Sequence, residues 1–201
     1  MSSKTLSYIL RHGAIDLNLD ISVDGFMQID TLLNYLNNQN KNKNIITVDH
    51  IKEIVLHDQK GRFTIKDNMI RANQGHSIVS VKSSALLKKI DPLTLQNCVH
   101  GTNKKAWSSI KTEGLKKMGR NEIHFIKNYT NSVDDIKGLR SRSEVLIFLD
   151  LEKCSSSGIE FFESDNGVIL VPETIRPEFF KDVLFVSLVI RPKLTDRVEC
   201  H

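Results

Sequence analysis

In the first third of the chain, apolar residues recur at the spacing of amphipathic helices in three segments. This spacing predicts helices over residues 3–13, 30–36 and 47–56, the first of which ends at Gly13. The Lys- and Asn-rich stretch over residues 37–44 is typical of a polar loop. We therefore expect three short helices, each with one buried face.

Two short segments rich in β-forming residues follow. Residues 63–66 and 69–72 are separated by Asp67-Asn68, a pair that favours a tight hairpin turn. Three helices followed by a hairpin describe a winged helix, which we expect over residues 1–84. Winged helices often bind nucleic acid, although many serve only as protein contact modules.

The second half indicates a mostly β lobe over residues 96–201, reached through a connector at 85–95. A strand at 98–100 precedes a helix over residues 103–113, which Gly114 closes. The expected fold class is therefore α+β. The strongest strand signals, rich in Val, Ile, Leu and Phe, lie at residues 145–151, 167–171 and 183–190.

Alternation near residue 123 predicts one more strand. Ile123 and Phe125 share the face that we expect to be core, while Glu122 and His124 share the other, polar face. A histidine on that face can line a cleft, although an exposed strand histidine is the commoner case.

Composition limits the function classes. The three cysteines form no CxxC pair, so free thiols in a reducing compartment are expected and no zinc site is implied. No secretory leader and no apolar stretch of membrane-spanning length occurs, so we expect no membrane partner. The expected location is the cytoplasm, or the nucleus and cytoplasm of a nucleated cell. Without GxGxxG or GxxxxGK[ST], Rossmann and P-loop phosphate sites are excluded.

The net charge of +4 comes from the first half of the chain. Residues 1–90 hold 12 Lys and Arg against 8 Asp and Glu, and residues 91–201 hold 16 of each kind. This asymmetry is expected if the first half meets a polyanion, although an excess of this size is also common in soluble domains.

Three arginines and a histidine are the first candidates for chemistry: Arg11, His12, Arg62 and Arg120. Arg offers a planar fork to phosphate oxygens, and His can move a proton near neutral pH. The simpler interpretation of Arg11-His12 is a solvated helix end, where the helix dipole favours cations. The local pattern alone favours that simpler interpretation.

Two further motifs lie between these residues. Residues 100–102, His-Gly-Thr, stand at a strand end, where Gly lets a ligand approach and His and Thr offer hydrogen bonds to ribose and phosphate. Taken without context, these three residues are better explained as a strand-to-helix turn with a capping Thr. Residues 74–77, Gln-Gly-His-Ser, are either a ligand contact or a buried turn.

The order of the motifs resembles that of a known family. The series is Leu6-Ser7-x-x-Leu10-Arg11-His12, Gly25-Phe26, Lys60-x-Arg62-Phe63, Ala72-x-Gln74-Gly75-His76-Ser77, His100-Gly101-Thr102, Met118-x-Arg120 and Asn166-Gly167-Val168. Over about Ser3 to Leu188, this ordered set strongly resembles the RNA 2′-phosphotransferases, the NAD-dependent enzymes of tRNA splicing.

The resemblance implies an N-terminal winged-helix RNA lobe and a C-terminal NAD lobe with the ADP-ribosyltransferase fold. The implied substrate is RNA, expected to be tRNA, with an internal 2′-phosphate at a splice junction, and NAD is the co-substrate. The phosphate would attack the anomeric carbon of the nicotinamide ribose and release nicotinamide. The neighbouring ribose hydroxyl would then attack the phosphate, so ADP-ribosylated RNA is converted to 2′-OH RNA and ADP-ribose 1″,2″-cyclic phosphate.

The resemblance also assigns roles to residues. Arg11, Arg62 and Arg120 would clamp the phosphate, His12 would orient it or transfer the second-step proton, and Lys60 would assist the second step. The residues matched to the NAD site are His100, Gly101, Thr102, His124, Val168 and Arg140. Those matched to RNA contacts are Arg11, Arg62, Gln74 and His76. No metal is expected, because the arginines supply the positive charge, and a monomer is the simpler expectation.

Two positions depart from the family pattern. Gly61 stands where a polar residue is common, which would loosen the segment before Arg62. Glu122 replaces a frequent histidine. Because a carboxylate repels phosphates, we expect Glu122 to face solvent or to pair with a cation.

Two alternative functions remain open. An ADP-ribosyltransferase of the same fold would modify a nucleic-acid terminal phosphate or a protein and stop after the first step; the presence of both Lys60 and Arg62 argues against it. A catalytically silent winged-helix module would bind nucleic acid or a protein partner. It would have no reason to combine the phosphate clamp with the NAD motif.

Overall fold

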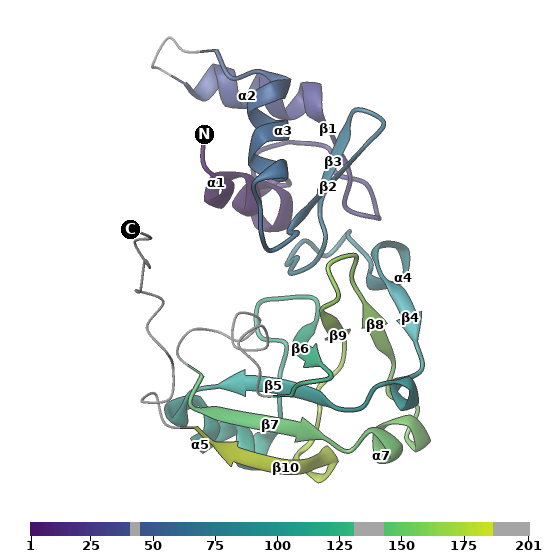
Figure 1. Ribbon diagram of the computed structural model, residues 1–201. Coiled ribbons are helices and arrows are strands. Elements are labelled where there is room, and N and C mark those ends of the chain that lie inside the picture. Colours follow the sequence, from purple (N-terminus) through teal and green to yellow (C-terminus); the bar gives the residue numbers. More distant parts are fainter. Residues whose placement is uncertain (41–44, 131–142, 187–201) are drawn as a thin grey trace, which may run out of the picture.

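The computed structural model describes residues 1–40, 45–130 and 143–186, which form two lobes (Figure 1). The first lobe, purple to blue in the figure, carries three helices and a small sheet, and the second, teal to yellow, is built on a larger sheet. The predicted α+β class is confirmed.

The first lobe contains the predicted three helices and hairpin, arranged with a sheet in the order β1-β3-β2. Its elements are α1 (Ser3–Tyr8), the π-helical turn η1 (Ile9–Gly13), β1 (Met27–Gln28), α2 (Ile29–Gln39), α3 (Val48–Leu56), β2 (Phe63–Lys66) and β3 (Met69–Ala72). The hairpin turn at Asp67 and Asn68 has φ angles of 46° and 60°, which Asp and Asn tolerate better than most residues.

Gly13 ends the helical segment, as predicted, but not as a left-handed helix cap. The helix widens into the π-turn, and Ala14 beyond it keeps helical dihedral angles of −52° and −47°. A Cβ on Gly13 would lie 2.7 Å from Cε1 of Tyr8. Glycine is required here by close packing, not by a left-handed helix end.

The second helix is longer than predicted. Asn37, which was expected to begin a polar loop, lies inside α2. Its side-chain amide donates to the backbone oxygen of Ile46 at 2.9 Å and accepts from the backbone nitrogen at 2.8 Å. This tertiary contact compensates for the low helix propensity of Asn.

The second lobe is mostly β, as predicted, with one antiparallel sheet in the order β10-β7-β5-β6-β9-β8-β4. Its described strands are β4 (Lys88–Ile90), β5 (Cys98–Thr102), β6 (Ile123–Lys127), β7 (Val145–Leu149), β8 (Phe161–Glu163), β9 (Ile169–Val171) and β10 (Phe180–Phe185). Its described helices are α4 (Ser83–Leu86), η2 (Pro92–Thr94), α5 (Lys104–Glu113), α7 (Leu151–Ser156) and η3 (Pro177–Phe179).

Two predicted strand ends differ. Leu151 begins α7 instead of ending a strand, because the side chain of Asp150 caps that helix by accepting from the backbone nitrogen of Lys153 at 3.0 Å. The predicted strand segment at residues 187–190 lies outside the described residues.

Strands β8 and β9 supply side chains to two hydrophobic cores. Phe161, Ile169 and Val171 are buried in the core of the second lobe. Phe162 and Leu170, which face each other across the two strands, are buried in the core of the first lobe. Because alternate residues of a strand point to opposite faces, this hairpin closes both cores and joins the lobes.

Gly114, at the end of α5, is expected to tolerate substitution poorly. Its φ of 81° and ψ of 179° lie in a region restricted to glycine, and a Cβ would lie 2.3 Å from the backbone oxygen of Ile175. We expect Gly114→Ala to lower the free energy of unfolding by about 3 kcal/mol or more, measured by urea denaturation.

Gly119→Ala is the matched control, because a Cβ on Gly119 would meet no atom within 4 Å. A change below about 0.5 kcal/mol is expected. Equal losses in the two variants would show that the crowding at Gly114 is not the cause.

Candidate active site

Arg11 and His12 lie on the π-turn η1, where the segment after β3 holds them. The backbone nitrogen of Ser77 donates to the carbonyl oxygen of Arg11 at 2.9 Å, and the Ser77 hydroxyl hydrogen-bonds to Nδ1 of His12 at 2.8 Å. Such turns insert an extra residue into a helix and often occur at functional sites. Residues 74–77 therefore fix both the backbone and a side chain of the turn.

The guanidinium of Arg11 is enclosed among other cations. Its Nε and Nη2 are buried and have no hydrogen-bond partner among the described residues. Burial, followed by the positive charges of Arg120 and Arg62, lowers the pKa of Arg11 to about 10. The three arginines singled out in the sequence thus lie near one another, and two donors of Arg11 find no acceptor among the described residues.

His12 belongs to the same cluster. Burial lowers the pKa of its imidazole, and Arg120 and Arg11 lower it further. At neutral pH the ring is therefore mainly neutral, with one nitrogen able to accept a proton.

Arg62 is held by Asp58, four residues earlier at the end of α3. Nη2 of Arg62 lies 2.6 Å from Oδ1 of Asp58, Nε donates to the same oxygen at 2.8 Å, and the backbone nitrogen donates to Oδ2 at 2.5 Å. The Asp58 side chain is only 1% exposed. Burial raises the pKa of this carboxyl, but the bonds from Arg62 outweigh that effect and lower it overall.

The loop before Arg62 is fixed by two amide side chains. Nδ2 of Asn73 donates to the carbonyl oxygen of Gly61 at 2.8 Å, and Nδ2 of Asn166 donates to that of Lys60 at 2.9 Å. Gly61 has a φ of 54°, which glycine adopts without strain. Contrary to expectation, the glycine does not loosen this segment.

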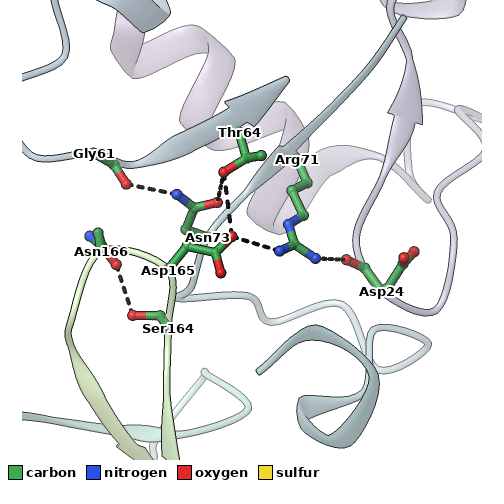
Figure 2. Close-up of polar contacts among 8 residues, drawn as sticks. All are labelled: Asp24, Gly61, Thr64, Arg71, Asn73, Ser164, Asp165 and Asn166. Carbon is green, nitrogen blue, oxygen red and sulfur yellow. Dashed lines mark hydrogen bonds and ion pairs between the residues drawn. The ribbon is translucent and has the colours of Figure 1, made fainter. Parts of the chain in front are cut away.

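The contact between the lobes continues beside this loop, as Figure 2 shows. The turn between β8 and β9 carries Asp165, which pairs with Arg71 of β3 at 2.7 Å. Arg71 also reaches the carbonyl oxygen of Asp24 at 3.4 Å and lies 4.7 Å from the ring centre of Phe26. The second lobe therefore touches the hairpin of the first at several points.

Arg120 and Gln74 meet at His124 on β6. Nη1 of Arg120 lies 3.2 Å from Nε2 of His124. Nε2 of His124 also hydrogen-bonds to Oε1 of Gln74 at 2.6 Å. Burial and the charge of Arg120 lower the pKa of His124 to about 3, so its ring is neutral at pH 7. The neighbours Ile123 and Phe125 are buried in the second core, as the alternation predicts.

The His-Gly-Thr motif forms the end of β5, next to His124. Nδ1 of His100 hydrogen-bonds to the carbonyl oxygen of His124 at 2.9 Å, and its ring packs edge-on against Phe125 with centroids 5.7 Å apart. His100, Gly101 and Thr102 are half-buried. Val168, the half-buried residue that precedes β9, packs against the first core.

His76 is fully buried, with 0% of its surface exposed, and neither ring nitrogen has a partner among the described residues. Burial, followed by the charge of Arg11, lowers its pKa to about 4. Its carbonyl oxygen accepts from the backbone nitrogen of Asn121 at 2.8 Å. In this conformation His76 can act on a ligand only through the segment that it supports.

Glu122 does not face solvent, which was one of its two expected settings. It is 2% exposed, and the Ser83 hydroxyl donates to its Oε1 at 2.6 Å. Burial raises the pKa of its carboxyl, although Ser83, Lys117 and Arg120 oppose the change. The side chain is therefore buried and bonded to Ser83, the first residue of α4.

Of two further predicted residues, one is not fixed in the cluster by its side chain and the other cannot be placed. Lys60 is exposed, and the structure fixes its backbone, through Asn166, not its ammonium group. Arg140 lies outside the described residues. Within the described ranges, no three His, Cys, Asp or Glu side chains are grouped to hold a metal, and no helix is long and apolar enough to cross a membrane.

Sequence reasoning missed the residues that support the arginines. Asp58, Asn73 and Asn166 had no assigned role, although Asp58 stands four residues before Arg62 and Asn166 lies in one of the ordered motifs. Together the cluster presents desolvated, preorganised donors beside a neutral imidazole. Such an arrangement suits binding and reaction of a phosphate group.

Comparison with known proteins agrees with this chemistry. Residues 1–173 match the family described as RNA 2′-phosphotransferase, Tpt1 / KptA family. The tRNA 2′-phosphotransferase 1 of Mus musculus is 37% identical, over 94% of this chain and 78% of the mouse protein. The probable RNA 2′-phosphotransferase of Rhizobium leguminosarum is 38% identical, over 84% of this chain and 86% of the bacterial protein.

Arg11→Met is expected to stabilise the protein in phosphate-free buffer. The change removes one of three converging positive charges together with buried donors that lack partners, so we expect the free energy of unfolding to rise by about 1 kcal/mol. Inorganic phosphate should raise the melting temperature of the native protein but not that of the variant.

Arg62→Met is the contrasting variant, because it leaves the buried carboxylate of Asp58 without its partner. Its free energy of unfolding should fall by about 3 kcal/mol. A stabilised Arg62→Met, or an Arg11→Met that responds fully to phosphate, would contradict this account of the cluster.

The burial of His76 predicts a pH dependence of stability. Its pKa is about 4 in the folded protein and about 6.5 when unfolded, so the unfolded chain binds more protons between these values. The free energy of unfolding should therefore fall as the pH drops from about 6.5 to about 4. In His76→Phe that loss should shrink by up to about 3 kcal/mol in urea titrations at each pH, and an unchanged slope would exclude His76 as its source.

Proposed function

The chain belongs to the RNA 2′-phosphotransferase family, Tpt1 / KptA, and from this premise we propose that its arginine cluster binds the internal 2′-phosphate of an RNA. The observation that carries the proposal is Arg11, whose Nε and Nη2 are buried without partners beside two further guanidiniums. A phosphate dianion supplies the acceptors and the charge that such a cluster requires. Because three vertebrate relatives, from zebrafish, mouse and human, are named tRNA 2′-phosphotransferase 1, we take tRNA as the RNA.

In the first step, an oxygen of the 2′-phosphate bonds to C1″ of the nicotinamide ribose of NAD. The bond from that carbon to the nicotinamide nitrogen breaks, and nicotinamide leaves with the electron pair. The nucleophile is already an anion, so the step depends on positioning more than on a strong base. Arg11 and Arg120, held by the π-turn and by His124, are suited to that task.

In the second step, the ribose 2″-hydroxyl attacks the phosphorus and the bond from phosphorus to O2′ of the RNA breaks. The hydroxyl proton must finally reside on O2′. His12 suits this transfer, because its ring is mainly neutral and Nδ1 is engaged by Ser77, which leaves Nε2 to serve the substrate. Arg62 and Lys60 would stabilise the charge that builds on the phosphate.

NAD would lie along β5 and β6 of the second lobe. The residues proposed to contact it are His100, Gly101, Thr102, His124, Val168 and Arg140. Two observations support NAD binding here. Gly101 has no side chain to block a ligand between His100 and Thr102, and all three residues are half-buried. NAD supplies the ADP-ribosyl group that accepts the phosphate.

We assign the two lobes accordingly: a winged-helix RNA lobe over residues 1–84, a connector over 85–95 and an ADP-ribosyltransferase-like lobe over 96–201. The helices, hairpin and antiparallel sheet are consistent with these assignments. The proposed RNA contacts are Arg11, Arg62, Gln74 and His76, the last through the backbone that it supports.

The test is incubation of the purified protein with NAD and a short RNA that carries one internal 2′-phosphate, followed by mass analysis. We expect 2′-OH RNA, nicotinamide and ADP-ribose 1″,2″-cyclic phosphate. Arg62→Ala should accumulate ADP-ribosylated RNA, because its second step should slow by about 10²-fold or more.

Arg176→Ala is the control, since Arg176 is an exposed arginine that pairs with Glu178 on η3; it should match the native protein. RNA that stays ADP-ribosylated with the native protein would favour a terminal-phosphate transferase. Untouched NAD would favour a silent binding module.

A further inference from the structure

Asn166 links the second lobe to the loop that carries Lys60 and Arg62. It lies in the turn between β8 and β9, and its Nδ2 donates to the carbonyl oxygen of Lys60 at 2.9 Å. Its Oδ1 accepts from the hydroxyl of Ser164 at 2.8 Å, which fixes the orientation of the amide (Figure 2). The bond therefore comes from a side chain that is itself held in place.

The loop is seated closely on this residue. A Cβ on Gly61 would lie 3.2 Å from Cβ of Asn166, so the backbone of the loop approaches the turn without a side chain between them. Within the first lobe, the Asn73 side chain donates to the carbonyl oxygen of Gly61, and Asp58 accepts from the side chain of Arg62. Asn166 is thus the one holder of this loop, among the described contacts, that comes from the other lobe.

The chemistry makes this cross-lobe contact significant. Between the two steps the phosphorus is bonded through oxygen both to the RNA ribose and to the ribose derived from NAD. Lys60 and Arg62, the residues proposed to stabilise the second step, must then be correctly positioned relative to the lobe that holds the ribose derived from NAD. An error of about 1 Å in such a placement costs up to about 10²-fold in rate.

We propose that Asn166 is a positioning residue for the second step, which sets the Lys60–Arg62 loop relative to the NAD lobe through its bond to the carbonyl oxygen of Lys60. This inference rests on the proposed function. The first step depends for positioning on Arg11 and Arg120, neither of which belongs to the loop. Arg62, as a proposed RNA contact, would change only the binding of RNA, so the first-step rate at saturating RNA should be insensitive to Asn166.

A merely adhesive role makes a different prediction. If the turn between β8 and β9 only held the lobes together, loss of the Asp165 side chain would slow the reaction as much as loss of Asn166. Asp165 precedes Asn166 in that turn and pairs with Arg71 across the same contact. The Asp165 side chain is 52% exposed, so this ion pair contributes about 1 kcal/mol or less to stability. Asp165→Ala therefore breaks the neighbouring contact and leaves the loop held.

The experiment measures single-turnover rates of both steps with NAD and the 2′-phosphorylated RNA. Asn166→Ala should slow conversion of ADP-ribosylated RNA by about tenfold or more and change its formation by less than about twofold. Asn166→Asp, which keeps the shape but cannot donate to Lys60, should show the same split. Asp165→Ala should leave both rates within about twofold of the native values, and Arg62→Ala marks the full second-step defect.

Each outcome is informative. Equal slowing of both steps in Asn166→Ala, or the same split in Asp165→Ala, would overturn the positioning role. A defect in Asn166→Asp alone would also overturn it, because introduced charge would then be the cause. If the native protein forms no ADP-ribosylated RNA, the proposed function itself fails, and the melting temperature of each variant identifies any that is unfolded.

Discussion

Repulsion among three guanidinium groups is the constraint on which the site depends. Arg11, Arg62 and Arg120 are close enough that the second and third lower the pKa of the first, and the buried carboxylate of Asp58 bonds directly to Arg62. The remaining charge is contained by backbone geometry: a π-turn fixes one arginine, and a neutral histidine contacts another. Because Arg11 carries buried donors without partners among the described residues, an anion bound there would offset the repulsion within the cluster and its cost to stability.

The two lobes cannot be treated as separable parts. The face of β8 and β9 that points away from their own lobe completes the core of the other, and the turn between them reaches the hairpin β2–β3. The arginine cluster draws Arg11 and Arg62 from the first lobe and Arg120 from the loop before β6. Shared burial of apolar surface, more than the exposed ion pair of Asp165, therefore keeps the arginines of the two lobes in place.

The elements that could be predicted from the sequence are those set by hydrophobic periodicity and by turn residues. The third helix, the hairpin at Asp67-Asn68 and the helix closed by Gly114 were all found where expected, because each depends on residues near in sequence. The π-turn and the full length of α2 were missed, since a tertiary contact decides each of them. Glu122 was expected to face solvent or a cation and lies buried against Ser83, because its burial depends on a part of the chain 39 positions away.

The candidate residues were accessible from motif order, whereas their supports were not. Nothing local marks Asn73 or Asn166 as partners of a loop far away in the chain. The hairpin β8–β9 adds a constraint of another kind. Since Phe162 and Leu170 serve one core while their neighbours serve the other, a one-residue insertion or deletion there would exchange the two sets of side chains and expose both cores at once. The hairpin can therefore vary in composition across evolution far more readily than in length.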